Sequence, residues 1–279
     1  MNIPLAEQPN NLSMPRFGIG TWCMGERPSE ARAEIAVIAA AVERGVTLID
    51  TAEMYGEGGA EKIIGQAVTY GRERLYVVSK VYPHNASLKG TIEACERSLK
   101  RLRMDYLDCY LLHWPGEHPI AQTVAAFETL KAQGKIRAWG VSNFDLAAMQ
   151  ELVSVDNGSD AVTNQVLYNL SRRGVEFDLL PWQREHGVTT MAYSPLEQAR
   201  LMASTKLQTL ARDVGATPAQ LALAWLLHKP DVIVIPKTTH VARLEENLKA
   251  LELTLDATTL AALDVAFAPP TRRTALQML

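Results

Sequence analysis

Four residues with side chains suited to acid–base chemistry stand where apolar runs of the sequence end. Asp50 ends the run in "LIDTAEMYG" and Tyr55 follows it in a turn, Lys80 ends "YVVSK", and His113 lies near the end of "YLDCYLLHW". Each of them alone is more often a helix cap, a solvated charge or a core histidine. An acid, a lysine, a tyrosine and a histidine at one place would be costly to bury without a use. The prediction of a site therefore depends on whether the fold brings the four together.

Together these side chains could deliver a proton to an oxygen atom. A tyrosine hydroxyl has an ordinary pKa near ~10, too high for an efficient proton donor at neutral pH. We expect the Lys80 cation to lower the pKa of Tyr55, and Asp50 to keep Lys80 charged and oriented. His113 could hydrogen-bond a substrate oxygen and orient it. The group is suited to protonating a carbonyl oxygen while the carbonyl gains electrons from a hydride.

The elements that must position these residues are short β-rich runs that alternate with segments of helical periodicity. Such alternation predicts βαβ units with parallel strands, and eight units in about 250 residues match an α/β fold of the (β/α)8, or TIM, barrel type. In that barrel the carboxyl ends of all strands converge on one face, so residues that end neighbouring strands lie side by side. The predicted strands are 16–22, 47–50, 76–80, 106–114, 136–143, 161–165, 189–195 and 231–237.

We predict a single barrel domain over residues 1–279, because no linker rich in Pro, Gly or Ser divides the chain. A short hairpin within residues 1–14 is expected to cap the barrel. Extra helices are expected before and after the last strand, two of them in 196–230. An open dinucleotide-binding sheet is the alternative, but "GIGTWC" has Cys23 where its third glycine should stand.

Helical periodicity is clearest over 30–45 and 87–102. Ser29 and Ser87 precede these segments and are expected to cap them.

Composition excludes several classes of function. Of the 279 residues 47% are apolar, and 28 basic against 31 acidic residues leave a net charge of -3, which gives little support to nucleic-acid or membrane binding. No apolar run approaches the ~18 residues of a membrane span, and the first residues do not resemble a signal peptide. The three cysteines have unrelated spacings, which suggest neither a disulfide framework nor a zinc site. These features predict a soluble cytoplasmic protein without a bound metal.

Seven stretches occur in an order that is typical of one enzyme family. They are "LIDTAEMYG", "VVSK", "LDCYLLHWP", "GVSNF", "NQVLYN", "AYSPL" and "IPKTTHVARLEEN". Together they resemble the signatures of the aldo-keto reductases over about residues 18–251. The stretches "IDTAEMYGEGGAEKIIG", "SKVYPHNAS" and "ALQML" are most similar to the bacterial NADPH-dependent methylglyoxal-reductase branch of that family. The resemblance implies a (β/α)8 barrel that binds NADPH and reduces aldehydes and ketones. It also implies a catalytic tetrad of Asp50, Tyr55, Lys80 and His113 with Tyr55 as proton donor.

The resemblance further implies which residues contact the cofactor. It assigns Ser142, Asn143 and Gln165 to the nicotinamide carboxamide and Tyr193 to stacking on the nicotinamide ring. Without the resemblance, Tyr193 would be read as a core aromatic, and Ser142 with Asn143 as a helix cap. The other implied cofactor contacts are Thr21, Trp22, Ser194, Leu196, Lys237, Thr238, Thr239, Arg243, Glu246 and Asn247.

The segment "IPKTTHVARLEEN" favours NADPH over NADH. Lys237 and Arg243 flank the start of a predicted helix, and a helix N-terminus with a lysine and an arginine suits a phosphate. NADP carries such a group as the 2′-phosphate of its adenosine ribose. The alternative is that both cations pair with Glu245, Glu246 or solvent, but the resemblance favours phosphate binding.

Aromatic residues are predicted to wall the substrate cleft. Trp22, Tyr82 and Trp114 follow three of the predicted strands and would surround a substrate oxygen at His113, which leaves space for a small, apolar or planar carbonyl compound. Tyr82 stands where many aldo-keto reductases have tryptophan. The sequence ends at Leu279 without the long C-terminal loop with which larger members grip bulky substrates, and this favours a small substrate.

The leading hypothesis is therefore NADPH-dependent reduction of small carbonyl compounds, of the methylglyoxal or aromatic-aldehyde type, by a protein expected to be a monomer. One alternative is a barrel lyase or isomerase that uses Lys80 as a Schiff base. Another is a cofactor-binding redox sensor or subunit with little turnover.

Overall fold

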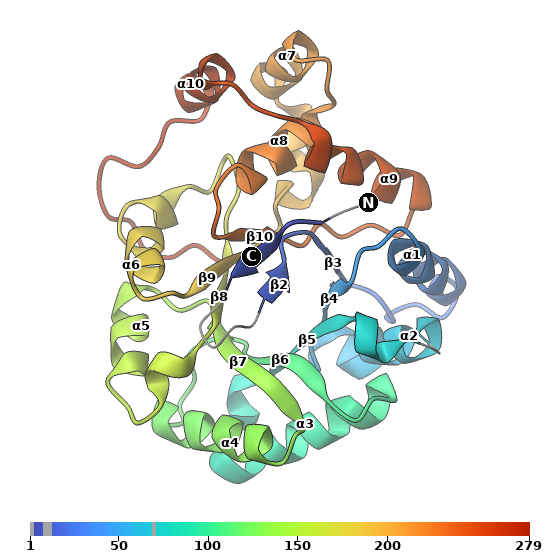
Figure 1. The fold of residues 1–279 in the computed structure, drawn as a ribbon, viewed down its shortest axis with the longest axis vertical. Coiled ribbons are helices and arrows are strands. Elements are labelled where there is room, and N and C mark those ends of the chain that lie inside the picture. The colour runs from blue at the N-terminus through green and yellow to red at the C-terminus, as the bar shows by residue number, and fades with distance from the viewer. Residues whose placement is uncertain (1–2, 8–12, 69–70) are drawn as a thin grey trace.

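The protein, described here by a computed structural model, forms a ring of parallel strands surrounded by helices (Figure 1). The structure describes residues 3–7, 13–68 and 71–279. The eight strands of the main sheet lie in the order β10-β9-β8-β7-β6-β5-β4-β3, and all neighbouring pairs are parallel. This confirms the predicted (β/α)8 barrel. The strands are β3 (Gly18–Gly20), β4 (Leu48–Asp50), β5 (Tyr76–Val81), β6 (Leu107–Leu112), β7 (Ile136–Ser142), β8 (Thr163–Leu167), β9 (Thr189–Tyr193) and β10 (Val232–Val234).

The two ends of the sheet meet and nearly close the ring. β3 and β10 are joined through the isolated bridge between Phe17 and Val234, through the Val234 N–H on the Arg16 carbonyl (2.9 Å) and through the Gly20 N–H on the Pro236 carbonyl (3.2 Å). A Cβ on Gly20 would lie 2.8 Å from the Ile235 carbonyl oxygen, so a larger residue would push the two edges apart. The join of first and last strand therefore depends on a glycine.

Helices cover the outside of the ring (Figure 1). Two of them, α7 and α8, precede the last strand and two follow it, as the sequence predicted. The helices are α1 (Ala31–Glu43), α2 (Gly59–Ala67), α3 (Leu88–Leu102), α4 (Ile120–Ala132), α5 (Leu146–Val153), α6 (Leu179–Glu185), α7 (Thr205–Asp213), α8 (Pro218–Leu227), α9 (Val241–Leu248) and α10 (Ala257–Ala266).

The two predicted helix caps have different outcomes. Ser87 caps α3, since its side chain accepts a hydrogen bond from the Gly90 N–H. The prediction for Ser29 is wrong: Glu30 is the N-cap residue of α1, and it makes no side-chain cap bond. The N–H groups of Glu30 and Ala31 are instead bonded to the carbonyls of Arg27 and Pro28, so a turn leads into the helix.

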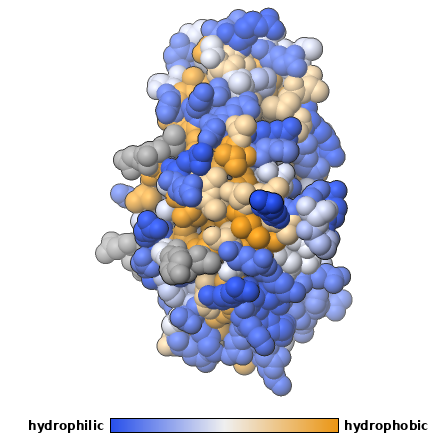
Figure 2. Space-filling view, turned by 90° about the vertical axis from the view of Figure 1, so that its right-hand side faces the viewer, coloured by the Kyte–Doolittle hydropathy of each residue, from blue (hydrophilic) through white to orange (hydrophobic). Residues whose placement is uncertain are grey.

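The apolar core has an inner and an outer layer. The outer cluster lies between the strands and the helices and includes Phe127, Trp139 and Leu223. The inner cluster fills the barrel with side chains such as Leu111 and Met191. Figure 2 shows the outer surface over α1, α2 and α9, where hydrophobic residues gather in the middle and hydrophilic ones surround them. None of the helices in the described ranges combines the length and the apolar character needed to cross a membrane.

The predicted N-terminal hairpin caps one end of the barrel. β1 (Leu5–Glu7) and β2 (Ser13–Pro15) pair antiparallel, and their side chains Ala6 and Met14 belong to the inner cluster. The turn between them falls at residues 8–12, outside the described residues. Because the hairpin closes this end, the opposite end is the one left for a site.

Candidate active site

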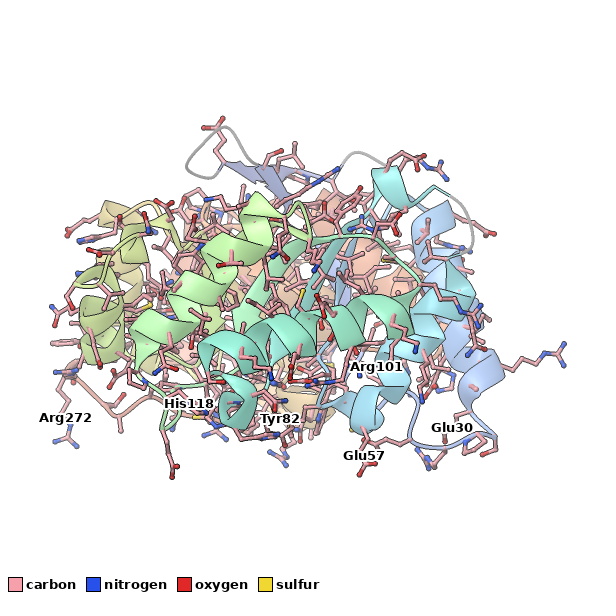
Figure 3. All side chains as sticks on the ribbon, turned by 90° about the horizontal axis from the view of Figure 1, so that it is seen from below. Glu30, Glu57, Tyr82, Arg101, His118 and Arg272 are labelled. Carbon is pink, nitrogen blue, oxygen red and sulfur yellow. The ribbon has the colours of Figure 1, made fainter. Side chains whose placement is uncertain are left out.

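The predicted site residues gather at the end of the barrel away from the hairpin. Figure 3 shows the hairpin at one end, and Tyr82, His118 and Glu57 at the other. This is the end where the strands have their carboxyl termini, since Asp50 is the last residue of β4 and Lys80 the last but one of β5. The structure thus places the strand-end residues where the barrel rule predicted.

A buried ion pair forms the centre of the site. The Lys80 ammonium lies 2.8 and 2.9 Å from the two carboxylate oxygens of Asp50, and the Lys80 side chain is 0% exposed. The same ammonium donates to the Thr51 carbonyl at 2.8 Å and lies 3.2 Å from the Tyr55 hydroxyl. Burial lowers the pKa of Lys80, and the negative charge of Asp50 opposes this effect. All donors of the ammonium are engaged, which argues against a lysine free to form a Schiff base.

Tyr55 lies in the 3-10 turn η2 (Tyr55–Gly58), directly above this pair. The Lys80 nitrogen is 4.9 Å from the centre of the tyrosine ring, within cation–π range. Tyr55 is partly buried, and burial raises its pKa well above its ordinary value of 10.0, with a smaller raising effect from Asp50. The prediction of a lowered pKa for Tyr55 is therefore wrong, because desolvation by burial is the largest effect. Tyr55 holds its proton firmly at neutral pH.

His113 follows β6 and lies next to Tyr55. The two rings meet edge to face with centroids 5.7 Å apart. The backbone N–H of His113 donates to the Val81 carbonyl at 3.1 Å. Burial, with the Lys80 cation as the second cause, lowers the pKa of His113 to about 2. The imidazole is therefore neutral, and its Nδ1 has no hydrogen-bond partner within the described ranges. A neutral ring can orient a substrate oxygen but carries no proton to spare.

The low pKa of His113 predicts a pH dependence of stability. An unfolded histidine binds a proton below about pH 6.5, whereas His113 in the fold does not, so the stabilising effect present above pH 6.5 is lost as the pH falls. From pH 7 to pH 5 we expect wild-type protein to lose about 2 kcal/mol of unfolding free energy more than His113→Asn does. Urea unfolding at both pH values measures this. The exposed His228 offers a control, since His228→Asn should follow the wild type. Equal losses in the wild type and His113→Asn would mean that His113 can be charged in the fold.

Ser142, Asn143 and Gln165, predicted to hold a carboxamide, lie on neighbouring strand ends. Both Ser142 and Asn143 are bonded to the backbone of Gln165. The Ser142 hydroxyl and the Asn143 backbone N–H donate to the Gln165 carbonyl, at 2.9 and 2.8 Å. The Asn143 side-chain amide donates to the His113 carbonyl at 3.1 Å, and the Tyr193 hydroxyl donates to the Asn143 side-chain oxygen at 3.1 Å. These contacts link the set to the tetrad.

The alternative that Ser142 and Asn143 cap a helix does not hold. Asp145 caps α5, with its side chain accepting from the Ala148 N–H at 2.9 Å. The Gln165 amide donates to Asp50 at 2.7 Å, on the oxygen that also faces Lys80. The sequence did not reveal this contact, because the two residues are 115 positions apart and meet only across the barrel interior.

The loop after β9 has an unusual backbone. Ser194, Glu197, Gln198 and Ala199 have φ of 46°, 51°, 52° and 68°, in the left-handed region that residues other than glycine rarely adopt. Ser194 and Leu196, predicted to contact the cofactor, lie at its start, where Leu196 is partly buried against the outer core. A loop of this shape persists only when its surroundings determine it.

Glu197 supplies the contacts that hold this loop. It is buried, and it accepts hydrogen bonds from Asn169 at 2.8 Å and from two nitrogens of Arg172 at 2.9 and 2.7 Å. Asn169 also donates to the Ser194 carbonyl at 2.9 Å. None of these three residues was predicted from the sequence. The one available signal was a charged residue directly after "AYSPL", which is too weak to select Glu197.

Lys237 and Arg243, which were predicted to bind the 2′-phosphate, flank the N-terminus of α9. Lys237 and Arg243 are exposed, and in the described part of the chain neither forms an ion pair. Glu245 forms its ion pair with Arg44, at 2.5 Å, and not with Arg243 as the alternative reading proposed. Of the other predicted cofactor contacts in this segment, Thr238 and Asn247 are buried, while Thr239 and Glu246 are half-buried. Two uncompensated cations at a helix N-terminus are suited to an anion.

Aromatic residues that were predicted to wall the substrate cleft include Trp114, which lies beside the tetrad. Trp114 is 4.8 Å from the His113 ring and 5.2 Å from the Tyr82 ring, and Trp22, which follows β3, is 46% exposed. Thr21, next to Trp22, is buried, and both its N–H and its hydroxyl donate to the Asp50 carbonyl. Trp114 thus joins Tyr82 to the tetrad, and Thr21 supports Asp50.

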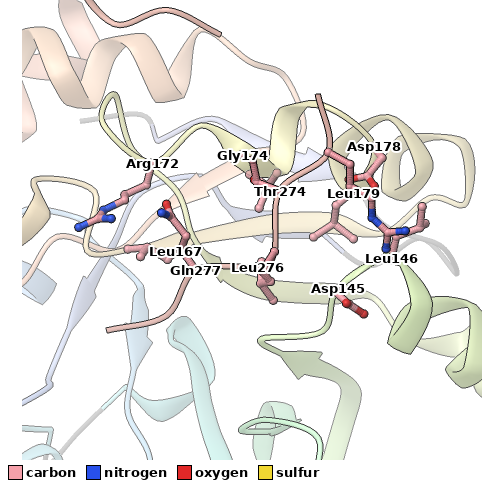
Figure 4. A pocket seen from close by; sticks show the side chains of 13 residues that line it. Asp145, Leu146, Leu167, Arg172, Gly174, Asp178, Leu179, Thr274, Leu276 and Gln277 are labelled. Carbon is pink, nitrogen blue, oxygen red and sulfur yellow. Dashed lines mark ion pairs between the residues drawn. The ribbon is translucent and has the colours of Figure 1, made fainter. Parts of the chain in front are cut away.

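The C-terminal segment runs past the same end of the barrel. Arg273 pairs with Asp178 at 3.0 Å, and Leu276 packs against the outer core. Between this segment and the loops after β7 and β8 lies a cavity of ≈ 330 Å³ (Figure 4), lined by Leu167, Arg172 and Leu179 among others. No tetrad residue lines it. Residues 3–7, 13–68 and 71–279 contain no group of His, Cys, Asp and Glu side chains that could hold a metal ion.

Comparison with known proteins gives one consistent result. Residues 16–267 match the model of the aldo/keto reductase family. Methylglyoxal reductase YeaE of Escherichia coli is 49% identical over 273 residues, which cover 96% of each chain, and glyoxal reductase of Bacillus subtilis is 36% identical over 88% of this chain and 86% of its own. A solved aldo-keto reductase from Klebsiella pneumoniae in complex with NADPH superposes with a TM-score of 0.96, at 45% identity and 100% coverage of both chains.

Proposed function

The chain belongs to the aldo/keto reductase family, and from this premise we propose that it reduces small aldehydes and ketones to alcohols with NADPH, with Tyr55 as proton donor. One observation carries the proposal above the others: the Tyr55 hydroxyl lies 3.2 Å from an ammonium that a buried carboxylate holds in place.

Tyr55 and Lys80 divide the work of proton transfer. When bound, NADPH supplies a hydride for the carbonyl carbon. The carbonyl oxygen then becomes an alkoxide, a far stronger base than a phenolate, so even a tyrosine whose pKa is raised can give up its proton. The phenolate left behind is stabilised by the adjacent Lys80 cation, which Asp50 keeps in place. By stabilising the phenolate, Lys80 opposes the rise that burial causes in the pKa of Tyr55.

His113 positions the carbonyl for this step. Its neutral ring can donate one hydrogen bond to the substrate oxygen. With a pKa lowered to about 2, His113 is not protonated at neutral pH and so has no imidazolium proton to give in place of that of Tyr55. The donor to the substrate and the donor of the proton are thus different groups.

The residues present fit NADPH. Lys237 and Arg243 are exposed cations without ion pairs in the described ranges, at the N-terminus of α9, where the 2′-phosphate would be held. Ser142, Asn143 and Gln165 would hold the carboxamide, and Tyr193 would stack on the nicotinamide. Thr21, Trp22, Ser194, Leu196, Thr238, Thr239, Glu246 and Asn247 complete the proposed contacts.

We propose methylglyoxal and small aromatic aldehydes as the preferred substrates. Trp22, Tyr82 and Trp114 would wall the proposed mouth beside the tetrad, and two relatives at 49% and 36% identity are a methylglyoxal and a glyoxal reductase. Loss of NADPH absorbance with a panel of aldehydes, sugars and steroid ketones tests this. The small aldehydes should have the highest kcat/KM, and equal turnover of a steroid ketone would contradict the proposed mouth.

The cations at α9 predict cofactor selectivity. Arg243→Ala removes one charge-assisted contact to the 2′-phosphate, which should weaken NADPH binding by about tenfold to a hundredfold, or ~1.5–3 kcal/mol, and leave NADH binding nearly unchanged. Quenching of protein fluorescence by each cofactor measures both affinities. Arg212→Ala, an exposed arginine on α7, controls for the change in net charge. Equal losses for NADPH and NADH would show that Arg243 does not recognise the phosphate.

A further inference from the structure

Glu53 is a nearly buried carboxylate in the loop that carries Tyr55, and the chemistry above does not use it. Its side chain is 8% exposed. One oxygen, Oε1, accepts the Tyr82 backbone N–H at 2.8 Å and the Asn85 side-chain amide at 3.0 Å. The other faces Arg97 on α3 at 3.8 Å, too far for a hydrogen bond. Burying a carboxylate costs free energy, so these contacts matter to the loop they join.

The two donors lie at the two ends of one short turn. Tyr82 precedes and Asn85 ends the 3-10 turn η4 (Pro83–Asn85), and the Asn85 N–H donates to the Tyr82 carbonyl at 2.9 Å. A single carboxylate oxygen therefore clamps this turn from outside. The Glu53 N–H in turn faces the Lys80 carbonyl at 3.4 Å, which ties the clamp to the strand that carries the catalytic lysine.

The clamped turn carries an aromatic wall of the mouth. The Tyr82 ring meets the Trp114 ring edge to face at 5.2 Å and 74°, and lies 4.5 Å from the His84 ring. Trp114 in turn contacts His113. The position of Tyr82 relative to the tetrad is thus set by its backbone, and its backbone is held by Glu53.

We propose that Glu53 is a positioning residue that fixes Tyr82 over the cleft and thereby controls carbonyl binding and the size of the substrate accepted. The inference rests on the proposed function. It predicts that Glu53 affects substrate binding while the proton-transfer group and the cofactor site remain intact.

The first test separates KM from kcat. Glu53→Ala should raise KM for an aromatic aldehyde by about tenfold, equivalent to ~1.4 kcal/mol, with kcat within about threefold and NADPH affinity unchanged. Glu53→Gln keeps an Oε1 acceptor of the same shape and should restore KM to within about threefold of the wild type. Glu117→Ala, an exposed glutamate in the loop after β6, is the matched control and should leave all three values unchanged. An unchanged KM in Glu53→Ala overturns the proposal, as does a Glu53→Gln variant equally impaired.

A double-mutant cycle tests whether Glu53 acts through Tyr82. Tyr82→Ala removes the wall itself, so adding Glu53→Ala in that background should change KM by less than about twofold. The same tenfold increase in both backgrounds would show that Glu53 acts elsewhere and would overturn the assignment.

Amide exchange of Tyr82 tests the clamp without any activity. Hydrogen–deuterium exchange of the Tyr82 N–H should be faster in Glu53→Ala than in the wild type and Glu53→Gln, because its acceptor is gone. If the wild type showed no NADPH-dependent turnover, the proposed function would fail while faster exchange still established the clamp. Unchanged exchange in Glu53→Ala would reject the clamp whatever the activity.

Discussion

Tyr55→Phe is expected to lower kcat by about 10²–10⁴-fold, the range that general acid catalysis contributes. The substitution removes one oxygen and keeps the ring that packs against His113 and the Lys80 ammonium. KM and NADPH affinity should change little, because the lost interaction matters only while the proton moves. Steady-state kinetics with methylglyoxal, together with cofactor titration, measure all three quantities.

The chain offers a matched control for this substitution. The Tyr110 hydroxyl on β6 is also buried, and it has no hydrogen-bond partner in the ranges that the structure describes. Tyr110→Phe removes the same atom from the core and should leave kcat unchanged. If Tyr55→Phe kept near-normal kcat, Tyr55 would not be the proton donor, and the role proposed for the turn after Asp50 would be wrong.

Lys80→Met is expected to damage both activity and stability. Without the cation the phenolate of Tyr55 is no longer stabilised, and kcat should fall by about 10²-fold or more. Asp50 would remain buried without its partner, and breaking a buried pair in this way typically costs ~3–5 kcal/mol of unfolding free energy. Urea unfolding and kinetics on the same preparation measure the two effects, with the exposed Lys100→Met as control.

The double variant Lys80→Met with Asp50→Asn separates these effects. A neutral amide removes the unpaired charge, so most of the lost stability should return while kcat stays low. Recovery of both stability and kcat would mean that the ion pair serves only the fold. Recovery of neither would mean that the methionine itself disrupts the packing.

The architecture could be predicted because the barrel repeats one local pattern. Each β-rich run ends in a polar residue and is followed by a helical period, and this alternation determines parallel pairing whatever the details of packing. The rule that strand ends share one face then placed Asp50, Lys80 and His113 together.

The remaining features depend on distances that no local pattern contains. The pKa of Tyr55 is raised chiefly because the residue is buried, and the sequence does not show how deeply a side chain is buried. The contact of Gln165 with Asp50 crosses the barrel, and the clamp of Glu197 on Arg172 joins two loops. The Ser29 cap failed for a local reason, since a turn from Arg27 replaces it.

The join between β3 and β10 is the place where the ring of strands is held by the isolated Phe17–Val234 bridge rather than by a longer ladder. Local unfolding starts where a structure has few contacts, so we expect the strands of the barrel to separate first at this join. Trp22 leaves the β3 side of that line and Lys237 the β10 side. A ligand bound by both residues would connect the two edges. Its binding should therefore slow the opening of the barrel at this join, and its release should allow the opening again.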